Sequence, residues 1–141
     1  MLRFRCERPQ GLLATDEHGL EILNEITNQV IGAAFEVAKA LGAGFLEKVY
    51  ERAMAEELKL RGLRVQPQAV YSVKYKGKSV GDYSADLVVA DKIIVELKCV
   101  ERFAPQHTAQ CLNYLKASGL KIALLINFQK PKVEWKRIIN G

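Results

Sequence analysis

Long hydrophobic runs are missing from this sequence, and so are repeats and low-complexity segments. No apolar run reaches the roughly 18–20 residues that would cross a bilayer, so we expect no membrane partner. The first eight residues are basic, but no apolar stretch follows them, and no secretory signal is expected. With 49% hydrophobic and 26% charged residues, the chain is expected to be a soluble globular protein.

Cysteine is scarce and does not have the spacing of a metal site. The three cysteines, Cys6, Cys99 and Cys111, are odd in number and far apart, and they form no CxxC pair. We therefore expect neither a zinc site nor a disulfide framework, and we interpret the three as reduced thiols in a cytoplasm.

Acidic side chains are few in the last part of the chain. The net charge is +5, and residues 101–141 hold seven basic but only two acidic side chains. A basic field of this kind suits an enzyme that binds a polyanion. Ordinary solubilising surface charge is the alternative, and charge alone does not separate the two.

The 141 residues are enough for one domain with a hydrophobic core. Residues 1–19 lack periodicity, and we expect a flexible N-terminal extension before a single domain at 20–141. Apolar periodicity and glycine stops predict the order α-α-β-β-β-α-β-β, a mixed α/β sheet flanked by helices. The expected helices span 20–41, 45–61 and 105–118, and the expected strands span 65–75, 83–89, 93–98, 121–128 and 133–139.

Three charges interrupt two neighbouring apolar strands, and they are the most informative residues in the chain. Glu96 and Lys98 are two apart on one strand, so they share a face. A two-residue loop before that strand would set Asp86 opposite Leu97, whereas a three-residue loop at 90–92 sets Asp86 opposite Glu96. Because a buried charge is costly without a partner, we predict the three-residue loop.

This trio suits a divalent metal ion and a phosphodiester bond. Two carboxylates about 4 Å apart repel by ~4 kcal/mol at an effective dielectric of 20, and a cation relieves that repulsion. Oxygen ligands without His or Cys favour Mg²⁺ or Mn²⁺ over zinc. Lys98 can orient a water or neutralise a phosphate. The alternative is an ion pair between Lys98 and one of the acids, Asp86 or Glu96.

Two helices add polar groups before and after these strands. On the first, Glu47 lies beside the apolar face and Tyr50 is three residues further on. The alternative for Glu47 is a first-turn acid favoured by the helix dipole. The second helix has amide and aromatic side chains that can position a substrate, or that simply form a polar helix edge: Gln106, His107, Gln110 and Tyr114.

Together these residues resemble a known nuclease core. Asp86 followed by Glu96-Leu97-Lys98 resembles the PD-(D/E)xK motif, and Gln110 with Tyr114 resembles the QxxxY element of its exonuclease-type branch. The chain from about residue 23 to 140 is similar to the bacterial GxxExxY proteins, whose motif matches Gly44, Glu47 and Tyr50. It departs from that family's pattern at two accessory positions, Ala38 and Ala43.

The resemblance implies a restriction-endonuclease-like α/β fold and a role for each matching residue. Asp86 and Glu96 would be metal ligands, Glu47 an accessory ligand, Lys98 the catalytic lysine and Gln110 a second catalytic or positioning group. The substrate-positioning residues would be Tyr50, Gln106, His107 and Tyr114.

The leading hypothesis is therefore a Mg²⁺- or Mn²⁺-dependent nuclease acting on DNA more than on RNA. Two alternatives remain open: an inactive nucleic-acid-binding or accessory module, and a small homo-oligomeric scaffold. With little room for a separate DNA-reading domain, specificity must come from loops, a partner or a second subunit, and a homodimer would suit cleavage of both strands.

Overall fold

The computed structural model describes residues 13–140, with side chains from residue 17 onward, and it has the predicted order of elements. Residues 1–12, which include Cys6 and most of the expected extension, lie outside the described part. The helices are α1 (Leu13–Leu41), α2 (Glu47–Leu60) and α3 (Pro105–Ser118). The strands are β1 (Val65–Tyr75), β2 (Lys78–Val89), β3 (Ile93–Lys98), β4 (Ile122–Asn127) and β5 (Glu134–Ile139).

Helix α1 is longer than its apolar periodicity predicts. It begins at Leu13 rather than near residue 20, so residues 13–19, expected to belong to the N-terminal extension, are helical. The other helix boundaries lie within two residues of the predicted ones, and α3 ends before Gly119, which adopts a left-handed conformation at φ 78°. Across the described residues, no helix is both long and apolar enough to cross a membrane.

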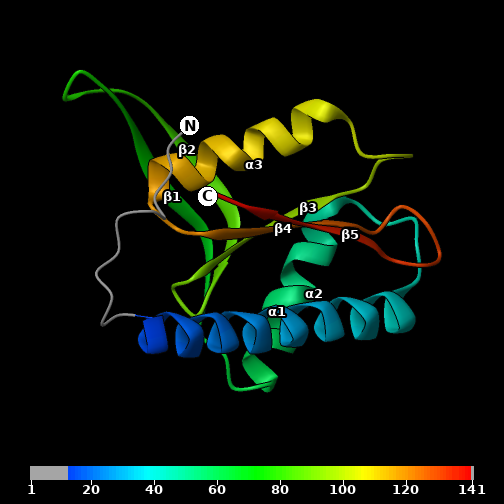
Figure 1. Cartoon of the computed structure of the whole chain (residues 1–141). Coiled ribbons are helices and arrows are strands. Elements are labelled where there is room, and N and C mark those ends of the chain that lie inside the picture. Colours follow the sequence, from blue (N-terminus) through cyan, green and yellow to red (C-terminus); the bar gives the residue numbers. More distant parts are fainter. Residues whose placement is uncertain (1–12, 141) are drawn as a thin grey trace.

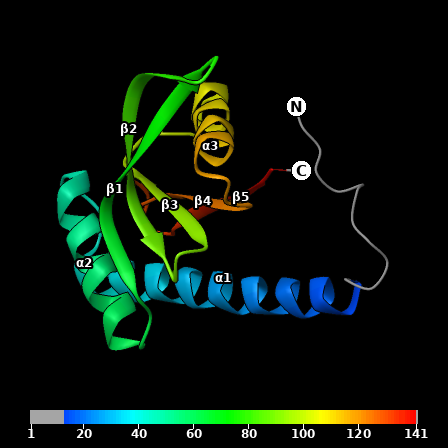
Figure 2. The same ribbon diagram turned by 90° about the vertical axis from the view of Figure 1, so that its left-hand side faces the viewer.

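The five strands form one sheet in the order β1-β2-β3-β4-β5 (Figures 1 and 2). All neighbouring strands are antiparallel except β3 and β4, which run parallel. A parallel pair needs a long crossover connection, and α3 supplies it. Strands β3 and β4 each have a neighbouring strand on both sides, and both are almost wholly buried. The continuous apolar run at residues 122–126 predicts this burial for β4.

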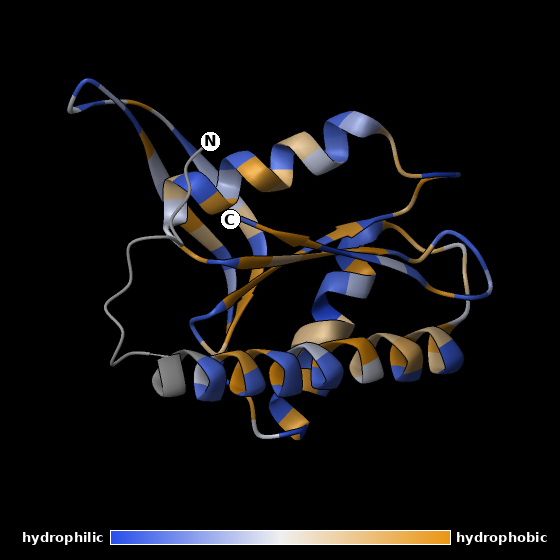
Figure 3. Cartoon of the chain, in the orientation of Figure 1, coloured by the Kyte–Doolittle hydropathy of each residue, from blue (hydrophilic) through white to orange (hydrophobic). Residues whose placement is uncertain are grey.

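Each face of the sheet carries its own hydrophobic core. Helices α1 and α2 cover one face, where Val30, Met54 and Leu58 pack on Leu97 and Leu124 of the sheet. Helix α3 covers the other face, and its Cys111 and Leu115 pack on a second group of sheet residues, among them Val88, Ile94 and Leu125. Figure 3 shows the hydrophobic residues gathered on the central strands between the two helical layers. Among the described residues, Cys99 and Cys111 are free thiols.

Two hairpins connect the first three strands. The β1–β2 turn is at Lys76 and Gly77, with φ angles of 50° and 82°, and the end of this hairpin projects beyond α3 (Figure 1). In the β2–β3 hairpin, Val89 pairs with Ile93, which leaves a three-residue loop at 90–92. This is the predicted register, and two left-handed residues, Ala90 and Asp91, make the turn possible.

Candidate functional site

Asp86 and Glu96 meet where the β2–β3 ladder stops. The last paired residues are Leu87 and Val95. Beyond that pair the backbone N–H of Asp86 donates to Oε2 of Glu96 at 3.0 Å, and the N–H of Leu97 donates to Oδ2 of Asp86 at 2.8 Å. Each carboxylate thus accepts a backbone hydrogen bond from the other strand, and the register that the sequence predicts brings the two acids together.

Burial makes both carboxyl groups hard to ionise. Glu96 is 5% exposed, and burial first, then the neighbouring Asp86, raise its pKa to about 8. Burial also raises the pKa of Asp86, and the charges of Glu51 and Glu47 raise it further. The hydrogen bond from Leu97 opposes this rise only in part. If both acids were ionised, the site would hold more negative charge than its own groups neutralise.

Lys98 is half-buried at the end of β3 and lies within electrostatic reach of both acids. Its ammonium group lowers the pKa of Asp86 and of Glu96, although less than burial raises them. Within the described part of the chain, no carboxylate forms a salt bridge with Lys98 at 4.0 Å or less. The alternative of a simple ion pair does not describe this arrangement, and the ammonium group stays available to a ligand.

Helix α2 brings Glu47 to the end of β3. Oε2 of Glu47 accepts a hydrogen bond from the N–H of Cys99 at 3.3 Å, one residue beyond Lys98. Its charge also raises the pKa of both Asp86 and Glu96. Glu47 is exposed, so it stands at the rim of the site.

Tyr50 is not placed to contact a substrate, contrary to the expectation from its motif. It is fully buried, its ring stacks on Phe128 at 4.6 Å, and its hydroxyl donates to the carbonyl of Gly42. The same hydroxyl accepts the N–H of Phe45 at 3.3 Å. Tyr50 therefore holds the loop before α2, in which Gly44 has a φ of 112°, and this loop places Glu47.

The predicted residues of α3 have different surroundings. His107 accepts the N–H of Ala104 at its Nδ1 at 3.0 Å, so it caps the helix, and its expected role in positioning a substrate stays a prediction. Gln106 and Gln110 are exposed. Tyr114 is half-buried, and burial first, then Glu96, raise its pKa to about 12, so this phenol lies on the side of the carboxylates.

Two residues of the site were not predicted from the sequence. Glu51, 7% exposed, accepts hydrogen bonds from Lys48 at 3.0 Å and from Gln68 at 3.0 and 3.1 Å, and it raises the pKa of Asp86. Its spacing of four from Glu47 is the signal that could have found it. Asn127 is fully buried and pairs with Lys98 across β3 and β4. Its side chain accepts the N–H of Val100 and donates to the carbonyl of Val100, and so it fixes the backbone that follows β3.

A comparison with protein families identifies the chain's relatives. The model of the PD-(D/E)XK nuclease superfamily matches residues 24–138, which is most of the sequence and includes every residue of the site. The chain belongs to the PD-(D/E)XK nuclease superfamily. The finer assignment to the GxxExxY proteins rests on Gly44, Glu47 and Tyr50 and stays a prediction. No curated protein matches the chain.

Two solved structures share the fold of this PD-(D/E)XK superfamily member. An alkaline exonuclease (LHK-Exo) from Laribacter hongkongensis aligns with a TM-score of 0.51 and 15% identity, over 67% of this chain and 56% of that one. A protein named SSO0001 aligns with a TM-score of 0.52 and 15% identity, over 67% of this chain and 50% of that one. The chain thus spans about half the length of these structures, and at this identity the likeness shows the fold alone.

PD-(D/E)XK nucleases use divalent metals, and the residues of this site fit such an ion. In the described part of the chain, no group of three or more Asp, Glu, His or Cys side chains is arranged as a complete metal site. Mg²⁺, however, keeps several water ligands and needs only one or two carboxylates. Asp86 and Glu96 are such a pair, and a hard cation would offset the cost of ionising both of them.

Proposed function

We propose that this protein is a metal-dependent nuclease that hydrolyses phosphodiester bonds. The observation that carries the proposal is the reciprocal contact of Asp86 and Glu96, with Lys98 two residues further along the same strand. Membership of the PD-(D/E)XK nuclease superfamily supports it.

Each residue has a role that follows from its place. Asp86 and Glu96 would hold Mg²⁺ or Mn²⁺, with Glu47 as an accessory group at the rim. Bound there, the metal would supply a Lewis acid for the phosphate and lower the pKa of a water ligand. Lys98, which has no carboxylate partner within 4.0 Å among the described residues, would orient that water or balance charge on the phosphate.

The substrate proposed is nucleic acid, with DNA ahead of RNA. The excess of basic side chains in residues 101–141 supports a polyanion, because it offsets the repulsion between phosphates and the acidic site. The name of the structural neighbour LHK-Exo, an alkaline exonuclease, points to the same class of substrate. Gln110, exposed on α3 one turn before Tyr114, is proposed to contact the substrate beside the carboxylates.

A cleavage assay across substrates tests this function. The full chain is incubated with linear duplex, circular duplex and single-stranded DNA, and with RNA, in Mg²⁺, Mn²⁺ or EDTA. Metal-dependent products that disappear in Lys98→Ala and Asp86→Ala are the expected result. Binding without cleavage in every metal, unchanged by these substitutions, would instead identify an inactive nucleic-acid-binding module.

A further inference from the structure

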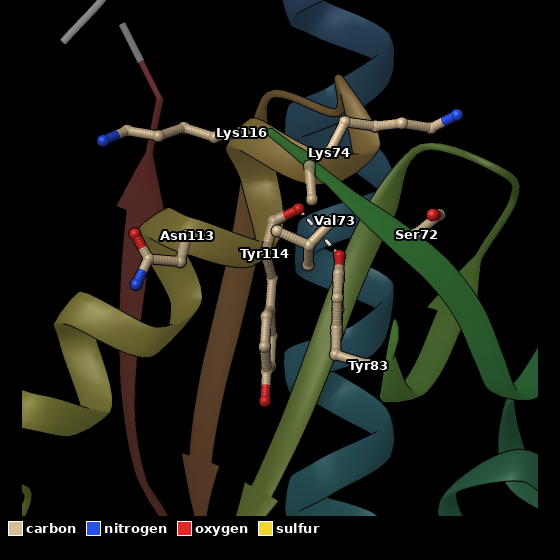
Figure 4. Close-up of a pocket in the computed structure, with 8 residues that line it drawn as sticks. Ser72, Val73, Lys74, Tyr83, Asn113, Tyr114 and Lys116 are labelled. Atoms are coloured by element: carbon tan, nitrogen blue, oxygen red, sulfur yellow. Dashed lines mark hydrogen bonds between the residues drawn. The ribbon is translucent and has the colours of Figure 1, made fainter. Parts of the chain in front are cut away.

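A groove of about 500 Å³ lies between the β1–β2 hairpin and the C-terminal half of α3 (Figure 4). This volume is in the range of about 300–1,000 Å³ that is typical of sites for small molecules. The hairpin contributes Ser72, Val73, Lys74 and Tyr83, and the helix contributes Asn113, Tyr114, Lys116 and Ala117.

The wall of this groove is held in one position. The hydroxyl of Tyr83 donates to the carbonyl of Tyr114 at 2.7 Å, and the two rings stack with centroids 3.9 Å apart and an angle of 6°. Tyr71 stacks on the other side of Tyr83 at 5.4 Å. These contacts tie the hairpin to α3, so the groove is a fixed feature of the surface. Beside the two rings, Val73 and Ala117 give an apolar lining.

The mouth of the groove is basic. Figure 4 shows the side chains of Lys74 and Lys116 extending to opposite sides of it, with the amide of Asn113 close to Lys116. Among the described residues, no carboxylate forms a salt bridge with either lysine. Helix α3 itself contains no acidic residue. An apolar lining between two free ammonium groups suits a ligand with a flat apolar part and phosphates at both ends.

Tyr114 connects this groove to the carboxylates. It contributes to the groove wall, and its ring stacks on Tyr83, which lies three residues before Asp86 on β2. The groove wall therefore shares β2 with Asp86, and a nucleic-acid strand bound at the proposed reaction site has the groove on the same strand of the sheet.

We propose that this groove binds a nucleotide of a single-stranded segment of the substrate, next to the phosphate that reacts at Asp86 and Glu96. The inference rests on the proposed function and adds the substrate class. The base or sugar packs on Val73 and the rim of the Tyr83–Tyr114 stack, while Lys74 and Lys116 contact flanking phosphates. A single strand is favoured over a duplex because only an unpaired nucleotide can enter an apolar groove.

Binding in EDTA tests the groove without cleavage. Fluorescence anisotropy measures the affinity of the full chain for a short labelled single-stranded DNA and for the blunt duplex of the same sequence. We expect Lys74→Glu with Lys116→Glu to weaken single-strand binding by about tenfold or more. The slope of log K against log salt should fall in magnitude by about 1.4, for two contacts at roughly 0.7 each.

Matched variants separate the groove from general charge effects. Lys39→Glu with Lys59→Glu makes the same change in net charge on α1 and α2, which cover the opposite face of the sheet, and it should weaken binding much less. Val73→Asp in the groove should weaken binding, whereas Val70→Asp, 63% exposed on the same strand but outside the groove, should not. Thermal unfolding confirms that each variant is folded.

The outcomes also separate this inference from the proposed function. Equal loss of binding in both lysine pairs, or a duplex bound more tightly than the single strand, would overturn the groove assignment. Cleavage by the wild type with unchanged binding in the groove variants would do the same and leave the nuclease in place. Groove-specific binding by a protein that cleaves nothing would support the groove and reject the nuclease.

Discussion

Where the backbone pairing of β2 and β3 ends, the side chains of Asp86 and Glu96 accept hydrogen bonds from backbone N–H groups of the opposite strand. Each carboxylate accepts an N–H of the opposite strand, Glu96 from Asp86 at 3.0 Å and Asp86 from Leu97 at 2.8 Å. This locks both side chains to the backbone at the point where the β2–β3 ladder ends. The geometry of the acidic pair is therefore set by the strand register, not by a flexible loop.

The raised pKa of Glu96 predicts that the metal-free protein loses stability as pH rises. The folded state holds this proton up to about pH 8, whereas the ordinary glutamate pKa is 4.5. Between these values the folded state binds more protons than the unfolded state, so the free energy of unfolding falls with rising pH. The contribution of this proton to the free energy of unfolding is on the order of a few kcal/mol. It is fully present below about pH 4.5 and is lost as the pH rises through about 8.

Thermal unfolding in EDTA between pH 5 and pH 8 measures this slope. Glu96→Gln should remove most of it, and saturating Mg²⁺ should reduce it in the wild type, because the metal takes the place of the proton. Glu36→Gln, at an exposed position on α1, is the control and should keep the slope. Equal slopes in the wild type and Glu96→Gln would show that Glu96 does not hold the proton.

The buried side chain of Asn127 should contribute substantially to the free energy of unfolding. Its side chain makes four hydrogen bonds, two to Val100 and one each to Gln129 and Glu134. Asn127→Ala leaves the partly buried backbone N–H and carbonyl of Val100 unpaired, and we expect a loss of about 2–3 kcal/mol. Urea unfolding measures it, with the exposed Asn28→Ala as a control within about 0.5 kcal/mol of the wild type. Similar values for both variants would contradict this account.

The buried hydroxyl of Tyr50 should stabilise the loop before α2. Tyr50→Phe keeps the stack on Phe128 but removes the hydrogen bonds with Gly42 and Phe45. We expect a loss of about 1–2 kcal/mol. Tyr75→Phe, at a tyrosine that is 63% exposed, is the matched control and should change little. If Tyr50→Phe were as stable as the wild type and changed only substrate affinity, the substrate role expected from the motif would be restored.

Local patterns predicted the fold and the acidic pair, because both follow from short periods in the sequence. Side chains alternate along a strand, so the positions of Asp86, Glu96 and Lys98 left one hairpin register that brings Asp86 and Glu96 together. Gly119 ends α3 at the expected residue for a similar local reason.

Tertiary contacts decided what the sequence could not. Whether Tyr50 points to a substrate or into the core depends on Phe128, which lies 78 positions later in the sequence. His107 caps its own helix, and spacing along the helix does not distinguish that role from one in a site. Glu51 belongs to the site only because Gln68 and Asp86 are brought against α2. The groove at Lys74 and Lys116 likewise exists only once the hairpin packs on α3.

The rate of DNA cleavage by Asp86→Asn, compared with the wild type at saturating Mg²⁺, tests the central claim most directly. The amide oxygen can still accept the N–H of Leu97, so the fold is kept while the charge is lost. The account predicts cleavage by the wild type, abolished by EDTA, and a loss of at least about a hundredfold in the variant. Asp82→Asn, exposed on the same strand, should cleave like the wild type. Metal-dependent cleavage that persists unchanged in Asp86→Asn would contradict it.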